Sequence, residues 1–382
     1  MTPVAIQKCQ RYDPELVEAA MRRALDSLGG MARFVKPGDR VCLKVNLLRS
    51  SRPDQAVVTH PSVVRAAVRL LQEAGGVVTI GDSPSGAFNV GVLRRAYKVT
   101  GYEAVARDTG ATLNLNTNSV HLANPRGKLI KRFEVMQAVV DADAIVTLPK
   151  LKTHVFTHFT GATKILFGVI PGVTKAGYHT KLQNVERFSE MLIDLLTLLP
   201  PRLAIMDAVV GMDGDGPSGG RPRPIGLIMA SPDSVALDVV ATTAVGIKPL
   251  SVPILRAAAE RGLTGGQVSD SELRGERLKD IQMADFLPAQ TSRLDLSRLP
   301  GFLRRWVADQ LVVRPVANPA RCTGCGACFV DCPVKAITMS DGVAVMDPGT
   351  CIRCYCCHEF CPDKAIDLVP GRVSLFFTSK KR

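Results

Sequence analysis

The sequence is poor in aromatic residues, has no long apolar run, and holds almost no cysteine in its first 320 residues. Aromatic residues make up 5% of the 382 residues, with a single Trp, whereas 46% are hydrophobic, so the interior must be mainly aliphatic. No window approaches the roughly 20 apolar residues of a membrane-spanning helix, and no apolar segment like that of a signal peptide follows the N-terminus. We therefore expect a cytoplasmic protein with no membrane span, folded as two or three domains.

Acidic residues are outnumbered, which points to anionic partners. The chain has 48 Lys and Arg against 35 Asp and Glu, a net charge of +13. A basic balance favours organic acids, phosphates, acidic proteins or nucleic acid as partners. The basic residues are scattered, however, and they form no stripe of basic and aromatic residues like that of a nucleic-acid binder. We therefore expect an anionic small molecule or a partner protein, and no nucleic acid.

Nine of the 11 cysteines lie between residues 322 and 361, which favours a metal module over a disulfide framework. The run C-x2-C-x2-C-x3-C-P occurs twice, beginning at Cys322 and at Cys351. This is the spacing of bacterial ferredoxins, in which the fourth cysteine of each run ligates the other cluster. Zinc sites would instead show two C-x2-C pairs with a longer gap. We predict two 4Fe-4S clusters, the first held by Cys322, Cys325, Cys328 and Cys361 and the second by Cys351, Cys354, Cys357 and Cys332.

The two cysteine runs belong to an internal repeat of about 30 residues. The similar segments VKAI at 334–337 and DKAI at 363–366 follow the two runs. We expect a ferredoxin-like module with pseudo-twofold symmetry over residues 313–370, between a helical linker at 291–312 and a basic tail at 371–382. Cys356 is extra to the pattern, and we interpret it as a small apolar filler rather than as a redox or ligating residue.

Residues 1–290 alternate short aliphatic strands with helices. Asp13-Pro14 supplies a helix N-cap followed by Pro at the first helical position, and Gly29-Gly30 ends that helix. Strands are predicted at 41–45, 77–81, 145–148, 203–206 and 225–229, and further helices at 60–74, 184–198, 234–245 and 253–261. This order predicts an α/β domain over residues 1–290, in one or two lobes with a largely parallel sheet, followed by a small α+β ferredoxin-like domain.

Polar side chains follow four of the predicted strands, where ligands bind in α/β folds. Each has an ordinary alternative as a turn, helix-cap or strand-edge residue, as do Asp213 and Asp215. Taken together they predict a site with cations from two strand ends and carboxylates from two others. These strand-end residues are Lys44, Asn46, Asp82, Lys150, Lys152, His154, Lys164 and Asp207.

Several motifs resemble the family called domain of unknown function 362. They are the segments 41–47, 59–61, 81–83, 149–154, 206–207 with 214–216, and 236–238. Members of that family often carry a C-terminal twin 4Fe-4S module with the Cys-Tyr-Cys-Cys-His-Glu element found here at 354–359. The resemblance covers nearly the whole chain and implies an iron–sulfur protein whose reaction is not established.

A second, more distant resemblance is to the lactate racemase family. The segment from His154 to Lys164, followed by Pro171-Gly172, is similar to a stretch in which a His and a Lys handle a nickel pincer nucleotide. By position, His154 and Lys164 would match those two residues. This chain departs from the pattern, because Thr163 replaces a more basic residue and the upstream histidine pair is not evident. The resemblance therefore favours a common scaffold more than a common cofactor.

Three functions follow from these patterns. The first is a redox enzyme in which the clusters exchange electrons with an anionic substrate, with Lys164, His154 and Lys152 in catalysis. Its substrate-binding residues would be Lys44, Asn46, Asp82, Lys150 and Asp207. The second is a non-catalytic electron carrier that docks onto a larger oxidoreductase, and the third is a nickel-dependent, racemase-like enzyme. His154 and His158 would share a face and could bind a metal if they lay on a helix, whereas the alternative is that His158 packs against a neighbouring loop.

Overall fold

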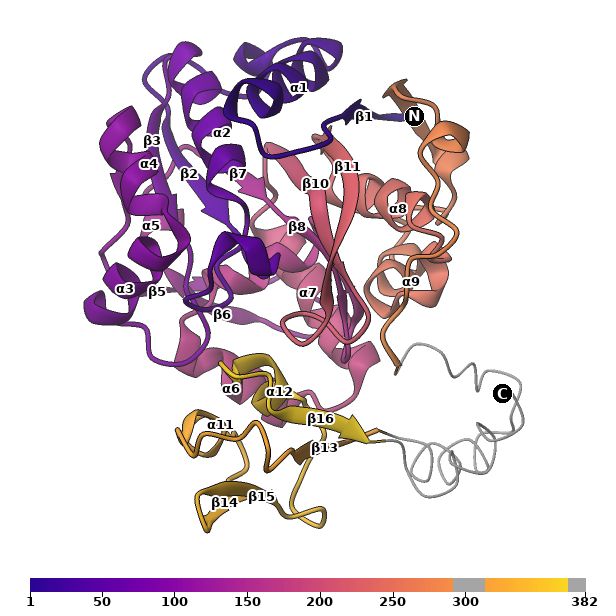
Figure 1. The fold of residues 1–382 in the computed structure, drawn as a ribbon. Coiled ribbons are helices and arrows are strands. Elements are labelled where there is room, and N and C mark those ends of the chain that lie inside the picture. Colours follow the sequence, from indigo (N-terminus) through magenta and orange to yellow (C-terminus); the bar gives the residue numbers. More distant parts are fainter. Residues whose placement is uncertain (291–312, 370–382) are drawn as a thin grey trace.

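The computed structural model describes residues 1–290 and 313–369, and it has a large sheet between helices with a small module below it (Figure 1). The sheet has ten strands and the order β12-β1-β11-β10-β7-β2-β3-β4, with β8 paired to β10 and β9 paired to β8. The strands are β1 (Thr2–Lys8), β2 (Arg40–Val45), β3 (Val77–Gly81), β4 (Thr112–Leu113), β7 (Ala144–Leu148), β8 (Lys150–His154), β9 (His158–Thr160), β10 (Leu203–Asp213), β11 (Arg221–Ser231) and β12 (Ser271–Gly275). Most neighbouring pairs are parallel, and β11 is antiparallel to both of its neighbours. The predicted α/β class is confirmed.

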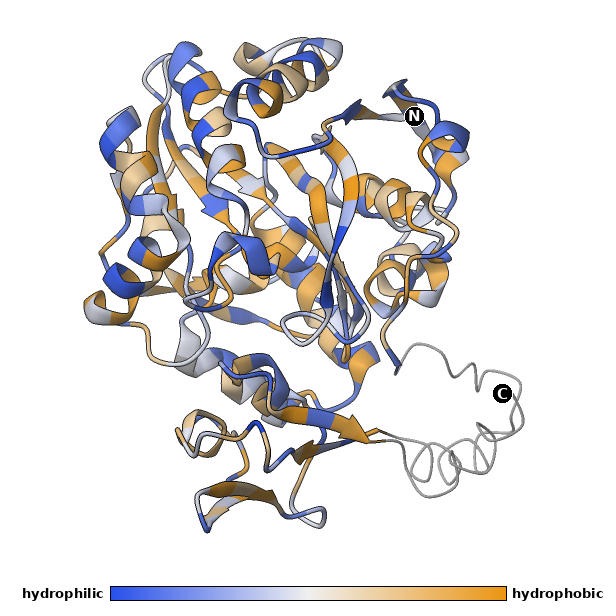
Figure 2. Ribbon diagram, in the orientation of Figure 1, coloured by the Kyte–Doolittle hydropathy of each residue, from blue (hydrophilic) through white to orange (hydrophobic). Residues whose placement is uncertain are grey.

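Helices cover both faces of the sheet. One core packs beneath α1 (Pro14–Ser27), α2 (Pro61–Glu73), α3 (Val90–Thr100) and α4 (Tyr102–Thr109). The other packs beneath α7 (Val185–Leu198), α8 (Ser234–Ala244) and α9 (Pro253–Glu260). Neighbouring residues of a strand pack into opposite cores, as Leu43 and Cys42 do. The strands are therefore apolar on both sides. Figure 2 shows this apolar character along the strands, with hydrophilic residues on the outer helix faces.

The helix starts follow from local sequence. Asp13 caps α1, since its carboxylate accepts hydrogen bonds from the backbone N–H groups of Glu15 and Leu16, and Pro14 is the first helical residue. His60 caps α2 in the same way, with Nδ1 accepting from the N–H of Ser62. The expected strands and helices are thus present, although β10 and β11 extend well beyond the predicted 203–206 and 225–229.

The segment after β7 is not a helix, which is the arrangement that would have placed its two histidines on one face. Residues 150–160 form the β8–β9 hairpin, in which His154 and His158 are cross-strand partners. β8 adds to the second half of β10, with Asp207 opposite Lys150 and Met212 opposite Lys152. The two histidines therefore do not share a helix face.

The cysteine-rich module is small and built as a repeat. β13 (Arg314–Ala317) pairs with β16 (Ile366–Val369), and β14 (Ile337–Ser340) pairs with β15 (Val343–Met346). The short helices α11 (Ala327–Val330) and α12 (Cys356–Phe360) occupy equivalent places in the two halves. The α/β domain also has two smaller features, the hairpin of β5 (Ser119–Ala123) and β6 (Arg132–Met136) and the short α5 (Gln137–Val140). The domain limits stay predictions, and the linker at 291–312 and the tail at 371–382 lie outside the described residues.

The loop between β10 and β11 holds the module against the α/β domain. The Nε2 atom of His358 lies 3.0 Å from the carbonyl oxygen of Asp215, and the Ser218 hydroxyl donates to the carbonyl of Glu359 at 2.9 Å. Lys364 Nζ donates to the carbonyl of Gly220 at 3.2 Å. The module is thereby placed below the sheet, beside α6 (Gly172–Lys181) (Figure 1).

Candidate functional site

A cavity of about 440 Å³ lies between the α/β domain and the cysteine-rich module. The α/β domain contributes the segments that follow β2 and β3, the end of the β8–β9 hairpin, the 3-10 helix η3 (Lys164–Val169), and α6. The module contributes residues 330–335 and one face of α12. The cavity is therefore at the carboxyl ends of parallel strands, where the sequence predicts a site.

One end of the cavity contains a buried ion pair. Lys44 Nζ lies 2.9 Å from Asp82 Oδ2, and the same oxygen accepts the N–H of Leu47 at 2.6 Å. Gly168 covers this pair, and a Cβ atom at that position would overlap both charged groups. Burial raises the pKa of Asp82, and the nearby lysines oppose that rise. Lys175 belongs to the same end, since its Nζ donates to the carbonyl of Ser83.

The other end contains two further lysines. Lys152 is buried on β8 and donates from Nζ to the carbonyl of Val57 at 2.8 Å. Burial, and then the charge of Lys164, lowers the pKa of Lys152 to about 7. Lys164 begins η3 and lines the cavity, with its Nζ 5.8 Å from the centre of the Phe167 ring. Both lysines face Glu359, whose carboxylate favours their charged forms.

Asp238 positions Lys164 without lining the cavity. Its buried carboxylate accepts the N–H groups of Ala162 and Thr163 at 2.6 and 2.8 Å, which fixes the turn directly before Lys164. Gly161 is required in this turn because a Cβ atom there would overlap Asp238 Oδ1. Burial raises the pKa of Asp238 to about 6.

His154 reaches the cavity through a residue of the module. Its Nδ1 accepts the backbone N–H of Phe156 at 3.0 Å, so the proton of the neutral ring is on Nε2, which lies 3.2 Å from Glu359 Oε1. Burial and the charge of Lys164 hold the pKa of His154 well below its usual range. His158 points elsewhere, toward the carbonyl of Ser251 at 3.2 Å. Within residues 1–290 and 313–369, no group of three or more His, Cys, Asp or Glu side chains could hold a single metal ion.

Lys150 and Asp207 lie outside the cavity lining and pair with each other. Lys150 Nζ is 2.8 Å from Asp207 Oδ2, and both side chains are buried. Asp207 also accepts the Tyr12 hydroxyl at 2.8 Å and the backbone N–H of His60 at 2.9 Å. This network ties the loop before α1 to the start of α2. Of the expected substrate-binding residues, the structure brings Lys44, Asn46 and Asp82 into the cavity.

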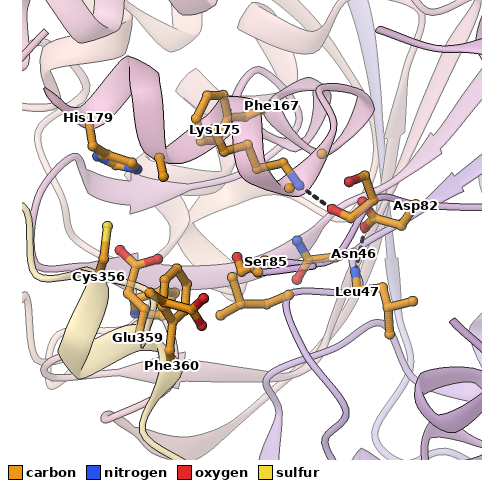
Figure 3. A pocket seen from close by; sticks show the side chains of 18 of the residues that line it. Asn46, Leu47, Asp82, Ser85, Phe167, Lys175, His179, Cys356, Glu359 and Phe360 are labelled. Atoms are coloured by element: carbon orange, nitrogen blue, oxygen red, sulfur yellow. Dashed lines mark hydrogen bonds between the residues drawn. The ribbon is translucent and has the colours of Figure 1, made fainter. Parts of the chain in front are cut away.

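Sequence reasoning did not assign Lys175, His179, Cys356 or Glu359 to the site, although all four line the cavity. Lys175 and His179 are four residues apart on α6, and this helical spacing is a signal that could have found them. Glu359 and Cys356 are within the Cys-Tyr-Cys-Cys-His-Glu element, and both point from α12 into the pocket (Figure 3). Cys356 is buried at the edge of the cavity, and its expected role as a small filler stays a prediction.

Two smaller cavities in the module are each lined by four cysteines. The first set is Cys322, Cys325, Cys328 and Cys361, and the second is Cys332, Cys351, Cys354 and Cys357. Backbone N–H groups already point at the thiols, since Ala336 donates to Cys332 Sγ at 3.3 Å and Ala365 to Cys361 Sγ at 3.2 Å. These features fit cuboidal clusters, which are held by four thiolates and tuned by such hydrogen bonds.

The left-handed backbone of the cysteine loops follows the repeat. Gly324 and Arg353 occupy equivalent positions, with φ of 68° and 57°, and so do Gly326 and Tyr355, with φ of 73° and 60°. Non-glycine residues rarely adopt such angles. The fold and the cysteine-lined cavities together define an iron–sulfur protein in which an α/β domain carries a ferredoxin-like module.

Comparison with known proteins gives the family. Residues 314–362 match the 4Fe-4S dicluster domain, so the chain carries two 4Fe-4S clusters. Residues 41–243 match the family described as domain of unknown function (DUF362), and the chain belongs to this family. It is 37% identical over 268 residues to the thylakoid-associated protein sll1697 of Synechocystis sp., a match that covers 68% of this chain and 79% of that protein.

Two solved structures are similar to parts of this chain. The lactate racemase apoprotein from Thermoanaerobacterium thermosaccharolyticum matches with a TM-score of 0.38 and 14% identity, over 61% of this chain and 55% of that one. A protein from Thermotoga maritima matches with a TM-score of 0.33 and 14% identity, over 59% of this chain and 57% of that one. The chain thus spans little more than half of either structure. Among the described residues, no helix is both long and apolar enough to cross a membrane.

Proposed function

We propose that this protein is an oxidoreductase in which one 4Fe-4S cluster exchanges electrons with an anionic substrate bound in the large cavity. The supporting observation is that Cys332, one of the expected cluster ligands, lines the same cavity as Lys44, Lys152 and Lys164. A lysine ammonium is a compact charge that suits the binding of an anion. A substrate held there would be in contact with residues beside a cluster.

The two clusters then have different roles. We assign the first to Cys322, Cys325, Cys328 and Cys361 and the second to Cys351, Cys354, Cys357 and Cys332. The second set includes the cysteine at the cavity, whereas Cys325 of the first set is exposed. When bound, the clusters would supply single electrons. The exposed Cys325 would hold the first near an electron donor at the surface, and Cys332 would hold the second beside the substrate.

The surrounding residues serve binding and proton transfer. Lys44 and Lys164 attract the anion, and Asp238 keeps Lys164 in place. Lys152 has a pKa near the working pH, as an efficient general acid or base requires. His154 supports this end of the cavity, with its Nε2 atom 3.2 Å from Glu359 Oε1.

A reoxidation assay tests this proposal. The protein is purified without oxygen, its clusters are reduced, and their visible absorption is followed as anionic metabolites are added one at a time. We expect one class of anion to reoxidise the clusters. In a Lys164→Met variant, the same anion should reoxidise them at least about tenfold more slowly.

Metal analysis accompanies the assay. Zinc without sulfide would contradict the iron–sulfur assignment, and stoichiometric nickel would support the racemase-like alternative.

The second candidate function is electron carriage to a partner protein. A groove of about 430 Å³ crosses the outer face of the module. Its lining includes Pro315, Val316, Val345 and the cluster cysteine Cys351, with the exposed Arg314 beside them. An apolar groove with a neighbouring cation suits an acidic redox protein. In the same assay, this function predicts that no metabolite oxidises the clusters while an acidic partner protein does.

We also propose a cytoplasmic location. The relative named as thylakoid-associated makes attachment to a membrane surface the alternative. Separation of cell membranes from cytosol at low and at high salt distinguishes the two, because a surface-attached protein would sediment with membranes at low salt.

A further inference from the structure

We propose that the cavity binds a dianion whose two anionic groups are at opposite ends of the molecule, such as a short dicarboxylate. This inference rests on the proposed function only in taking the cavity's ligand to be the substrate. It concerns the chemical class of that ligand, which the charges around the cavity indicate.

The distal end of the cavity, defined by Lys44, Lys175 and Asp82, has one more cation than anion. Asp82 pairs directly with Lys44. Lys175 is buried, and it donates hydrogen bonds to the backbone carbonyls of Ser83 and Pro84 rather than to a carboxylate. A buried cation is costly unless an anion compensates it. One ligand carboxylate at this end would supply that compensation.

The proximal end, defined by Lys152, Lys164 and Glu359, has the same excess. Within the described parts of the chain, neither lysine has a carboxylate at ion-pair distance, although Glu359 acts on both from nearby. Lys152 donates to one backbone carbonyl and lines the cavity. A second ligand carboxylate at this end would again balance the charge.

The two ends are separated across the cavity. Figure 3 shows Asp82 and Glu359 on opposite sides of the pocket, and the Lys175 side chain extends toward Asp82. Both ends also have buried polar atoms without a hydrogen-bond partner, Ser83 Oγ and Asn46 Oδ1 at the distal end and His179 Nδ1 and Glu359 Oε1 at the proximal end. A molecule with two separated carboxylates could supply one anionic group to each end.

The charge of the second cluster is the competing explanation for these lysines. Cys332 lies in the cavity lining, so that cluster could compensate Lys152 and Lys164. At the distal end, Asp82 is the carboxylate that acts on both Lys44 and Lys175. The two explanations make different predictions for variants at the two ends.

Binding measurements on the intact, cluster-loaded protein test the inference. Calorimetric titrations without oxygen compare succinate with butyrate, a monoanion of the same chain length, and with inorganic phosphate. We expect succinate to bind at least about tenfold more tightly than either. The variants Lys175→Met and Lys164→Met should each reduce this preference to about threefold or less. Lys181→Met is the matched control, because Lys181 is an exposed residue of the same helix α6 and should leave the preference unchanged.

Three results would overturn the inference. They are equal binding of butyrate and succinate, tighter binding of phosphate, and a Lys164→Met variant that changes only the cluster midpoint potential. Thermal stability and the visible spectrum show whether each variant is folded and loaded, and Lys175→Arg, which keeps the charge, should retain the preference for succinate. Tight succinate binding without any reoxidation of the clusters would uphold this inference and count against the proposed function.

Discussion

At the scale of single residues, the candidate site depends on buried charges whose partners come from distant parts of the chain. Lys44 is on β2, Asp82 directly follows the neighbouring strand β3, and Asp238 reaches from α8 to the turn before Lys164. These side chains are almost completely buried, so the loss of one partner leaves the other without compensation. Substitutions at these positions should therefore have large effects on the free energy of unfolding and on anion binding, and these two effects should be separable.

The first prediction concerns the turn that presents Lys164. Asp238→Ala removes the acceptor for two buried N–H groups, so we expect it to lower the free energy of unfolding by about 2 kcal/mol and to weaken anion binding at least about tenfold. Asp233→Ala is the control, since Asp233 also accepts two backbone N–H groups but only caps α8. It should cost about 1 kcal/mol and leave binding unchanged. Equal losses of binding in the two variants would show that Asp238 acts through stability alone. Chemical unfolding and calorimetry measure the two effects.

The second prediction concerns the pH dependence of binding. Burial lowers the pKa of both Lys152 and Lys175 to about 7, so each loses its proton as the pH rises through that value. A bound anion raises the pKa of both lysines. Above pH 7, binding must therefore be accompanied by uptake of protons by these lysines. The groups that face these two lysines are Lys44, Lys150, Lys164, Asp82 and Glu359.

Affinity for ethane-1,2-disulfonate, which is a dianion throughout the range, should fall at least about tenfold between about pH 6 and about pH 8.5. Calorimetry in buffers of different ionisation heat would also detect the proton uptake. Constant affinity across the range would contradict the assignment of these lysines to the ligand.

At the scale of secondary-structure elements, the β8–β9 hairpin and η3 together form the wall of the cavity. On β8, Lys150 pairs with Asp207, and Lys152, two residues later, lines the cavity. η3 follows directly and places Gly168 against the Lys44–Asp82 pair. A glycine in this position allows the closest approach of backbone to a buried ion pair.

The third prediction tests that close approach. Gly168→Ala adds a Cβ atom that would overlap both charged groups, so we expect about 2–3 kcal/mol of destabilisation and loss of measurable anion binding. Gly177→Ala is the control, because Gly177 lies within α6 with nothing near its Cβ position. That change should stabilise the protein by about 0.5–1 kcal/mol. Thermal unfolding and calorimetry measure both. Wild-type binding by Gly168→Ala would show that the ion pair can rearrange freely.

At the scale of the whole molecule, the cavity exists only because the module is docked below the sheet. Its lining combines residues of α6 and η3 with Cys332 and Glu359 of the module. The contact that aligns the two parts is the loop between β10 and β11, where Gly219 lies against the His358 ring. A substitution in this loop can therefore test whether anion binding is lost while the clusters stay bound.

The fourth prediction separates cluster binding from anion binding. Gly219→Ala would add a Cβ atom that overlaps the His358 ring, which should displace the module while leaving its eight cluster cysteines in place. We expect full iron content but at least about tenfold weaker anion binding. Gly349→Ala, whose Cβ atom would make only ordinary van der Waals contact with the Asp347 carboxylate, should change neither. Loss of iron in Gly219→Ala would indicate that the α/β domain is needed to hold the clusters. Iron and sulfide analysis alongside calorimetry decides between these outcomes.

The sequence by itself determined the alternation of strands and helices and the presence of two clusters. Both depend on local signals, namely aliphatic runs, helix caps and cysteine spacing, so they could be predicted without knowledge of distant contacts. The strand character of residues 150–154 could not, because two lysines in five residues argue against a buried strand unless Asp207 and the cavity are known to compensate them. Likewise, only the tertiary structure decided that Lys44 and Lys152 share a cavity with Glu359 whereas Lys150 and Asp207 do not. The physical reason is that a buried charge is stabilised by partners brought to it by packing, and those partners are far away in the sequence.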